Sequence, residues 1–249
     1  MLSYFRALTG AQRTPAANRH LGLALTFVAG AVNAGGFLAI GYYTSHMTGI
    51  VSAMADHLAL AYYPWVLGGI AAMLCFLLGA ASCALLVNWG RRQGWQSAYA
   101  LPLALEAVLL LVFGVLGSRL ANVGWVFVPT TVVLLCFVMG LQNAIITKIS
   151  NAEIRTTHVT GIVTDLGIEI GKWVYWNRAE HEQGRVLANR PRLRLLGGLL
   201  LMFFLGGVAG ALGFKHWGYA TTLPLAAIVL LFALVPILDD VRAVWRLRR

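Results

Sequence analysis

Long uninterrupted runs of apolar residues dominate the sequence, without the alternation of apolar and polar positions that marks a half-buried strand. About 20 apolar residues in a helix are needed to cross a bilayer core of about 30 Å. Six stretches meet this length, and we predict a transmembrane helix in each: residues 21–43, 65–88, 98–117, 124–147, 194–214 and 219–238. Because membrane β-barrels alternate apolar and polar residues, we expect an all-α integral membrane protein.

Two further segments are helical in pattern but too polar to be ordinary spans. Residues 46–61 contain Asp56, and residues 158–175 contain Asp165 and Glu169. We predict that each forms a short polar helix, which either re-enters the membrane or lies at its interface.

Composition supports the membrane class. The chain is 59% hydrophobic and only 11% charged, whereas soluble domains have about 25% charged residues. This excludes a soluble enzyme. The net charge of +10 would suggest nucleic acid in a soluble protein, but here the basic residues cluster at the ends of apolar segments. We therefore expect a lipid bilayer around the chain and no nucleic-acid partner.

The basic residues also orient the predicted spans. Residues 1–20 and 148–193 are basic, whereas residues 44–64 contain no Lys or Arg. Since cytoplasmic loops carry the excess of positive charge, we predict that residues 1–20 form a basic cytoplasmic N-terminus. The basic tail, residues 239–249, is also expected in the cytoplasm.

The sequence contains an internal duplication. Four pairs of matching segments occur in the same order in both halves: 27–34 with 137–144, 46–51 with 158–163, 76–79 with 203–206, and 101–104 with 223–226. Each repeat, 21–117 and 124–238, then contains three spans and one short polar helix. Three is odd, so the second copy must cross the membrane upside down. Two inverted three-helix repeats are typical of secondary transporters.

The duplicated motifs resemble the YoaK-like family of bacterial inner-membrane proteins. The resemblance rests on Phe-x-x-Gly-x-x-Asn-Ala, His-x-Thr-Gly and Thr-Asp-Leu-Gly, and it covers residues 20–238. It implies about six helices and a location in the bacterial inner membrane, in a family of unknown function that is suspected of transport. The chain departs from the family pattern at Asn33, where we associate the family with Asp, and at Ile50, where we associate it with Asn. Both departures argue against cation coupling through the first repeat.

The two His-x-Thr-Gly motifs are the strongest candidates for a substrate site. The threonine hydroxyls are expected to accept hydrogen bonds from N–H groups at the helix starts, and the glycines allow close approach. Two helix N-termini that meet near the midplane would favour an anion. Capped helices lying flat at the interface are the alternative. The candidate residues are His46, Thr48, Gly49, His158, Thr160 and Gly161.

Amide side chains inside the predicted spans extend this candidate site. Asn33, Asn143 and Gln142 lie in the first helix of each repeat. An amide in lipid is costly unless it is paired. These three residues therefore either line a substrate path or form hydrogen bonds between helices.

Acidic residues are candidates for coupling. Glu106 is the only acid in the middle of an apolar span, and an ionisable group inside a membrane is by default a functional hypothesis. Asp165 and Glu169 share a helix face and, with Asp56, are the acids nearest the motifs. The alternatives are a protonated Glu106 without a role and a structural pair between Glu169 and Lys172.

No pattern in the sequence suits catalysis, a metal or a cofactor, so we expect that the protein is not an enzyme. The first hypothesis is a small secondary transporter or exporter of a small polar or anionic solute. The second is a channel built on the same inverted repeat, and the third is a membrane scaffold or lipid-interacting protein that does not transport. Gly206 and Gly210 form a small-xxx-small face, which serves either internal packing or a homodimer, and we favour packing.

Overall fold

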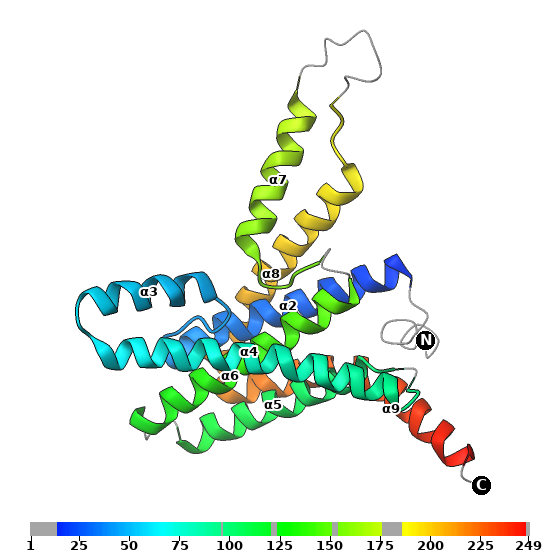
Figure 1. The fold of residues 1–249 in the computed structure, drawn as a ribbon, viewed down its shortest axis with the longest axis horizontal. Helices are drawn as coiled ribbons and strands as arrows, with labels where there is room; N and C mark the ends of the chain where they lie inside the picture. Colours follow the sequence, from blue (N-terminus) through cyan, green and yellow to red (C-terminus); the bar gives the residue numbers. More distant parts are fainter. Residues whose placement is uncertain (1–13, 96, 121–123, 151–153, 176–185, 248–249) are drawn as a thin grey trace.

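The computed structural model describes residues 14–95, 97–120, 124–150, 154–175 and 186–247, and these residues form helices joined by short connections (Figure 1). The helices are α2 (Pro15–Ile40), α3 (Met47–Ala59), α4 (Tyr63–Arg92), α5 (Ala100–Leu120), α6 (Gly124–Ile149), α7 (Val159–Val174), α8 (Arg190–Trp217), the 3₁₀ turn η2 (Gly218–Thr221) and α9 (Thr222–Leu247). The described part of the chain contains no strand.

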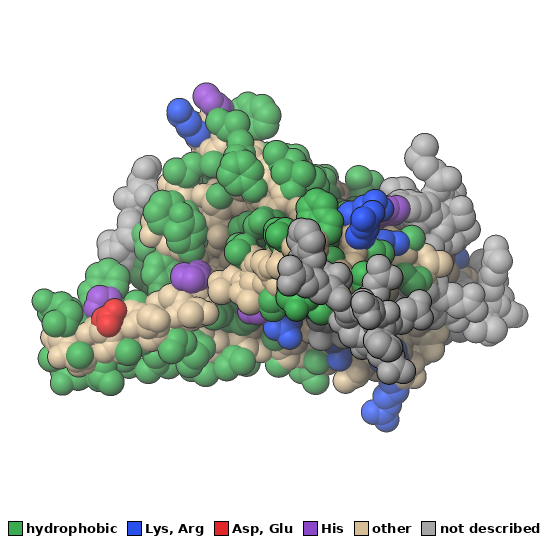
Figure 2. Space-filling view, turned by 90° about the horizontal axis from the view of Figure 1, so that it is seen from above, with side chains coloured by type: hydrophobic (Ala, Val, Ile, Leu, Met, Phe, Trp, Pro, Cys, Tyr) green, Lys and Arg blue, Asp and Glu red, His purple; other side chains and the backbone are tan. Residues whose placement is uncertain are grey.

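Five segments of the described chain are long and apolar enough to cross a membrane. Four of them lie in α2, α4, α5 and α6, and the fifth runs from Arg190 to Arg242 and includes α8, η2 and most of α9. Figure 2 shows apolar side chains over much of one face, with few charged ones between them. A surface of this kind is suited to lipid. The chain is therefore a helical membrane protein.

The first and last helices extend beyond the predicted limits. Thr14 caps α2, since its Oγ1 accepts a hydrogen bond from Ala17 N at 3.1 Å, and a proline occupies the first turn. Part of the segment 1–20 is therefore helical; residues 1–13 lie outside the described residues. At the other end, α9 continues to Leu247, so residues 239–247 of the predicted tail are a helical extension, and residues 248–249 lie outside the described residues. Apolar runs locate spans but not their polar ends.

Three helix pairs make up most of the bundle, and each joins one half of the sequence to the other. Helix α2 packs most extensively on α8, α4 packs on α6, and α5 packs on α9. In the α2–α8 pair, a Cβ added to Gly30 would lie 2.1 Å from the Phe203 carbonyl oxygen, and one on Gly206 would lie 2.0 Å from that of Phe27. Only glycine permits this approach.

The α4–α6 pair repeats the same contact. A Cβ on Gly79 would lie 2.0 Å from the carbonyl oxygen of Phe137, and one on Gly140 would lie 2.0 Å from that of Phe76. The four duplicated Phe-x-x-Gly segments thus pair reciprocally, each from one repeat with one from the other.

The small-residue face of α8 is used inside the molecule. A Cβ on Gly210 would lie 2.2 Å from the carbonyl oxygen of Ala31, one turn beyond the contact of Gly206 with Phe27. The preference for internal packing over a dimer contact is therefore confirmed for these two glycines.

The two short helices are placed differently. Helix α3 packs on α4 and lies alongside its first half, whereas α7 packs on α8 and projects with the start of α8 away from the bundle (Figure 1). The two copies of the short helix thus differ in how closely they follow the bundle.

Candidate solute-binding site

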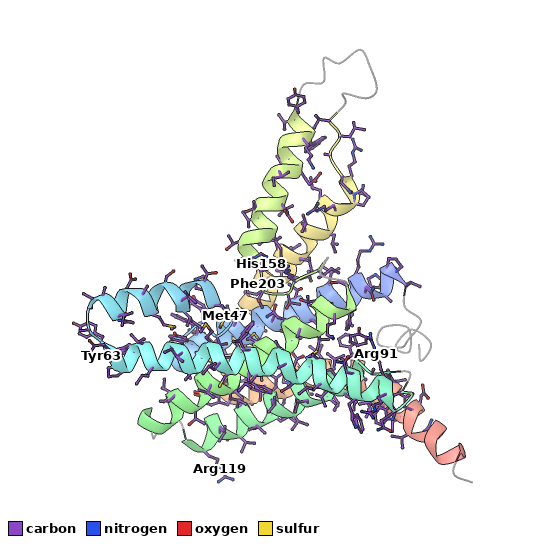
Figure 3. All side chains as sticks on the ribbon, viewed as in Figure 1. Met47, Tyr63, Arg91, Arg119, His158 and Phe203 are labelled. Carbon is purple, nitrogen blue, oxygen red and sulfur yellow. The ribbon has the colours of Figure 1, made fainter. Side chains whose placement is uncertain are left out.

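The starts of α3 and α7 border one cavity of about 660 Å³, which we call the central cavity. Figure 3 shows that Met47, His158 and Phe203 gather at the centre of the molecule, where the short helices begin. The volume of the central cavity falls in the usual range for small-molecule sites. The lining residues come from both halves of the chain: Asn33, Tyr43, Ser45, His46, Met47, Thr48, Phe76, Asn143, Thr147, Arg155, Thr157, His158, Val159, Thr160 and Phe203.

The two asparagines hold the loops that precede the histidines. Asn33 Oδ1 accepts hydrogen bonds from the backbone N–H and the hydroxyl of Ser45, at 3.3 and 2.9 Å. Asn143 Oδ1 accepts from the hydroxyls of Thr156 and Thr157, at 3.2 and 2.9 Å. Both amide side chains therefore accept hydrogen bonds from the loops and also line the central cavity.

Each histidine ring folds back onto the first turn of its own helix. A Cβ on Gly49 would lie 2.1 Å from His46 Cδ2, and a Cβ on Gly161 would lie 2.3 Å from His158 Nδ1. The glycine three residues after the histidine is therefore the residue that makes room for the ring. This explains the spacing of the two motifs in physical terms.

The expected capping role of Thr48 and Thr160 is wrong. The N-cap residues are His46 and His158, and neither helix has a side-chain cap hydrogen bond. Each threonine is the second residue of its helix, one position past the first helical residue. It therefore does not occupy the N-cap position from which a hydroxyl accepts hydrogen bonds from the first-turn N–H groups. The first-turn N–H groups of α3 and α7 thus keep their partial positive charge without a side-chain acceptor.

The charges that line the central cavity are positive. Arg155 is the one Lys or Arg among its described lining residues, the two imidazoles add ionisable nitrogens, and none of those lining residues is a carboxylate. Hydroxyl and amide groups supply hydrogen-bond donors, while Met47, Phe76 and Phe203 supply an apolar wall. Together these groups favour a small anion that carries an apolar part.

Comparison with known proteins agrees with the helical membrane fold. The family described as "Protein of unknown function (DUF1275)" matches residues 21–235. The chain belongs to this family. It is also 28% identical over 203 residues to the UPF0700 transmembrane protein YoaK of Bacillus subtilis, a match that covers 80% of this chain and 85% of the relative. No solved structure matches the chain significantly.

In this member of the DUF1275 family, several of the predicted site residues do not line the central cavity, and two of them, Gln142 and Glu106, are buried within the bundle. Gln142 Nε2 donates a hydrogen bond to the carbonyl oxygen of Leu25 at 3.2 Å, which ties α6 to α2. Glu106 is fully buried on α5, and neither of its carboxyl oxygens has a hydrogen-bond partner among the described residues. Glu106 does not line the central cavity, so any coupling role would act at a distance from it.

The candidate acids of α7 are tied to the start of α8. Arg192 Nη2 lies 2.9 Å from Asp165 Oδ2. Glu169 accepts hydrogen bonds from Lys172 Nζ at 2.9 Å and from the backbone N–H of Asn189 at 2.7 Å. These two donors, the Lys172 ammonium first, hold the pKa of Glu169 below its usual range.

The remaining acid, Asp56, is exposed on α3 and lies outside the central cavity. Among the described residues, no group of three or more His, Cys, Asp or Glu side chains is placed to hold a metal ion.

Three residues that line the central cavity are not among those predicted from the sequence: Arg155, Ser45 and Thr157. Arg155 stands in a basic segment, where the positive-inside rule already accounts for its charge. The signal that could have found it is the duplication itself. Aligning His46 with His158 places Tyr43 opposite Arg155, and both side chains line the central cavity.

Proposed function

We propose that the protein is a secondary transporter of a small anionic or polar solute, which binds in the central cavity. The observation that carries the proposal is the cavity wall. It combines two helix N-termini without side-chain caps, two histidines and an arginine, with no carboxylate among its described lining residues. A site of this charge stabilises an anion and disfavours a simple cation.

An inverted repeat supports a transport role. In this proposal, residues 21–117 and 124–238 are two three-helix repeats related by an axis in the membrane plane. The reciprocal Phe-x-x-Gly contacts of α2 with α8 and of α4 with α6 are what such an axis would produce. Transporters of this architecture place the substrate between their repeats, and residues of both halves of the chain line the central cavity, which supports the proposal.

The proposed setting is the bacterial inner membrane, with both termini in the cytoplasm. The distribution of basic residues supports this orientation. In this setting the protein needs no cofactor and performs no covalent chemistry, because the cavity supplies binding groups and the repeats supply movement.

Flux into proteoliposomes tests the proposal. Purified protein is reconstituted, and uptake of radiolabelled acetate, lactate, phosphate and sulfate is measured beside uptake of rubidium ions. We expect saturable uptake of at least one anion and no uptake of rubidium. Replacing His46 or His158 with alanine should reduce the anion uptake at low concentration about tenfold. His216→Ala is the matched control, because His216 is exposed near the end of α8 and lines neither the central cavity nor the cavity between α7 and α8.

Three other outcomes would contradict the proposal in different ways. Anion uptake that rises linearly with concentration would indicate a channel. Absence of flux for every anion in a monodisperse reconstituted protein would favour a membrane scaffold. Uptake of rubidium with none of the anions would mean that the acids on α5 and α7 determine the function.

A further inference from the structure

Arg155 lies in the wall between two cavities. It lines the central cavity and also a second cavity of about 720 Å³ between α7 and α8, which we call the α7–α8 cavity. Of the other residues, only His158 is shared by both linings. A solute that moved from one cavity to the other would therefore pass these two side chains.

The guanidinium of Arg155 makes no hydrogen bond or ion pair with any described residue. The neighbouring Arg192 differs, since it pairs with Asp165 at 2.9 Å, and both of these residues line the α7–α8 cavity. The one carboxylate in that lining is therefore already engaged and leaves the charge of Arg155 uncompensated. The side chain of Arg155 is exposed, so its guanidinium is accessible to a solute in either cavity.

The first repeat has no such charge. Its residue at the equivalent position is Tyr43, whose ring stacks on Phe37 with centroids 4.3 Å apart. The groove beside α3 is also filled, because the Met54 side chain lies where a Cβ of Gly69 would be, at 2.3 Å. Between α7 and α8, by contrast, the cavity of about 720 Å³ remains open. The charge and the open groove both belong to the second repeat.

We propose that Arg155 is the residue that selects for anions, and that carboxylate or phosphate groups reach it through the α7–α8 cavity. This inference rests on the proposed function of the central cavity as a solute site. A guanidinium keeps its charge at every physiological pH and offers a planar fork of N–H donors that matches two oxygens of a carboxylate or phosphate. Thr157 and His158, two and three residues after Arg155, line the central cavity with it and supply a hydroxyl and an imidazole.

Cysteine accessibility tests the charge selection without a known solute. Thr147 lines the central cavity, and Thr147→Cys serves as the reporter in a chain whose Cys75, Cys83 and Cys136 are replaced by alanine. If that chain does not fold, the native cysteines are kept and their background reaction is subtracted. The rates with an anionic and a cationic methanethiosulfonate reagent are compared in permeabilised vesicles. We expect Arg155→Gln to lower the anionic-to-cationic ratio roughly tenfold, as a unit charge about 6 Å away in a water-like medium would.

Matched variants separate charge from structure. Arg155→Lys should keep the ratio, and Arg119→Gln should leave it unchanged, because Arg119 is exposed at the end of α5 and lines neither cavity. The exchange of Tyr43→Arg with Arg155→Tyr should restore the ratio that Arg155→Tyr alone loses. An unchanged ratio in Arg155→Gln would overturn the assignment of Arg155.

A second variant tests the route. Thr164 is exposed and lines the α7–α8 cavity, whereas the adjacent exposed Val163 does not line it. Thr164→Trp should slow both reagents at the reporter about equally, and Val163→Trp should not. Equal rates in the two variants would refute the route.

These results are independent of the flux measurement. If flux is absent but the ratio responds to Arg155, the cavity selects anions without transporting them, and only the proposed function fails. If flux of an anion is observed but Arg155→Gln leaves both flux and the ratio unchanged, the proposed function survives and this inference fails.

Discussion

At the scale of single residues, the His-x-Thr-Gly motif is a device for placing an imidazole over the start of a helix. The ring of His158 occupies the space that a Cβ of Gly161 would need, and the ring of His46 does the same over Gly49. Thr160 belongs to the cavity wall and does not cap the helix. The histidine and the threonine of each motif therefore line the central cavity, and the glycine makes room for the histidine ring.

This pairing predicts the effect of adding one methyl group. Gly161→Ala should push the His158 ring off the helix and weaken anion binding about tenfold, or about 1.4 kcal/mol, while the melting temperature stays within a few degrees. Gly167→Ala on the same helix is the control, because its Cβ would meet no atom within 4 Å. Binding is measured by isothermal titration with the anion found to be transported. Equal affinities in the two variants would show that the position of the His158 ring does not affect anion binding.

At the scale of helices, the bundle is held by four close contacts between a glycine and a phenylalanine carbonyl. The contact of Gly206 with the Phe27 oxygen joins α2 to α8 at a distance that leaves no room for a side chain. Lipid chains are as apolar as the helix surfaces, so the hydrophobic effect does not drive helices together in a membrane. Helices in lipid therefore associate through close backbone approach of this kind. The same contacts fix the positions of α4 and α8, whose Phe76 and Phe203 line the central cavity.

Alanine substitutions on α8 test this packing. Gly206→Ala should force α2 and α8 apart and lower the free energy of unfolding by about 1–3 kcal/mol, as overpacking of a tight core does. Gly197→Ala on the same helix has open space around its Cβ and should stabilise slightly, by about 0.4–1 kcal/mol. Thermal unfolding in detergent distinguishes them. A higher melting temperature for Gly206→Ala than for Gly197→Ala would mean that the two helices do not touch here.

The sequence predicts helices better than it predicts the side chains of the site. Apolar length locates the spans because lipid demands it, and the duplication brings His46 and His158 to one cavity. The limits of the helices depend on local caps such as Thr14, which apolar length does not reveal. The unpaired state of Arg155 depends on which acids fold near it, and the sequence could not show that Asp165 pairs with Arg192 instead.

At the scale of the whole molecule, the arrangement of the two halves determines how the cavity is reached. Helices α3 and α7 start at the same central cavity but belong to repeats that are proposed to run in opposite directions. In that arrangement, the turn between α3 and α4 and the connection between α7 and α8 lie on opposite sides of the membrane. The first is free of Lys and Arg, whereas the second lies in a basic segment. The charge distribution and the repeat symmetry thus predict the same orientation, with the α3–α4 turn outside the cell and the α7–α8 connection in the cytoplasm.

Labelling with a membrane-impermeant maleimide tests this prediction. Tyr62 before α4 is 55% exposed, and Leu187 before α8 is 72% exposed, so a cysteine at either position is accessible to the reagent. We expect Tyr62→Cys to label in intact cells and Leu187→Cys to label only after the membrane is opened. Arg91 lies at the end of α4 opposite Tyr63 (Figure 3), so Arg91→Cys should behave like Leu187→Cys. Labelling of Tyr62→Cys and Leu187→Cys from the same side would contradict the inverted repeat, because an odd number of crossings per repeat cannot place equivalent turns on one face.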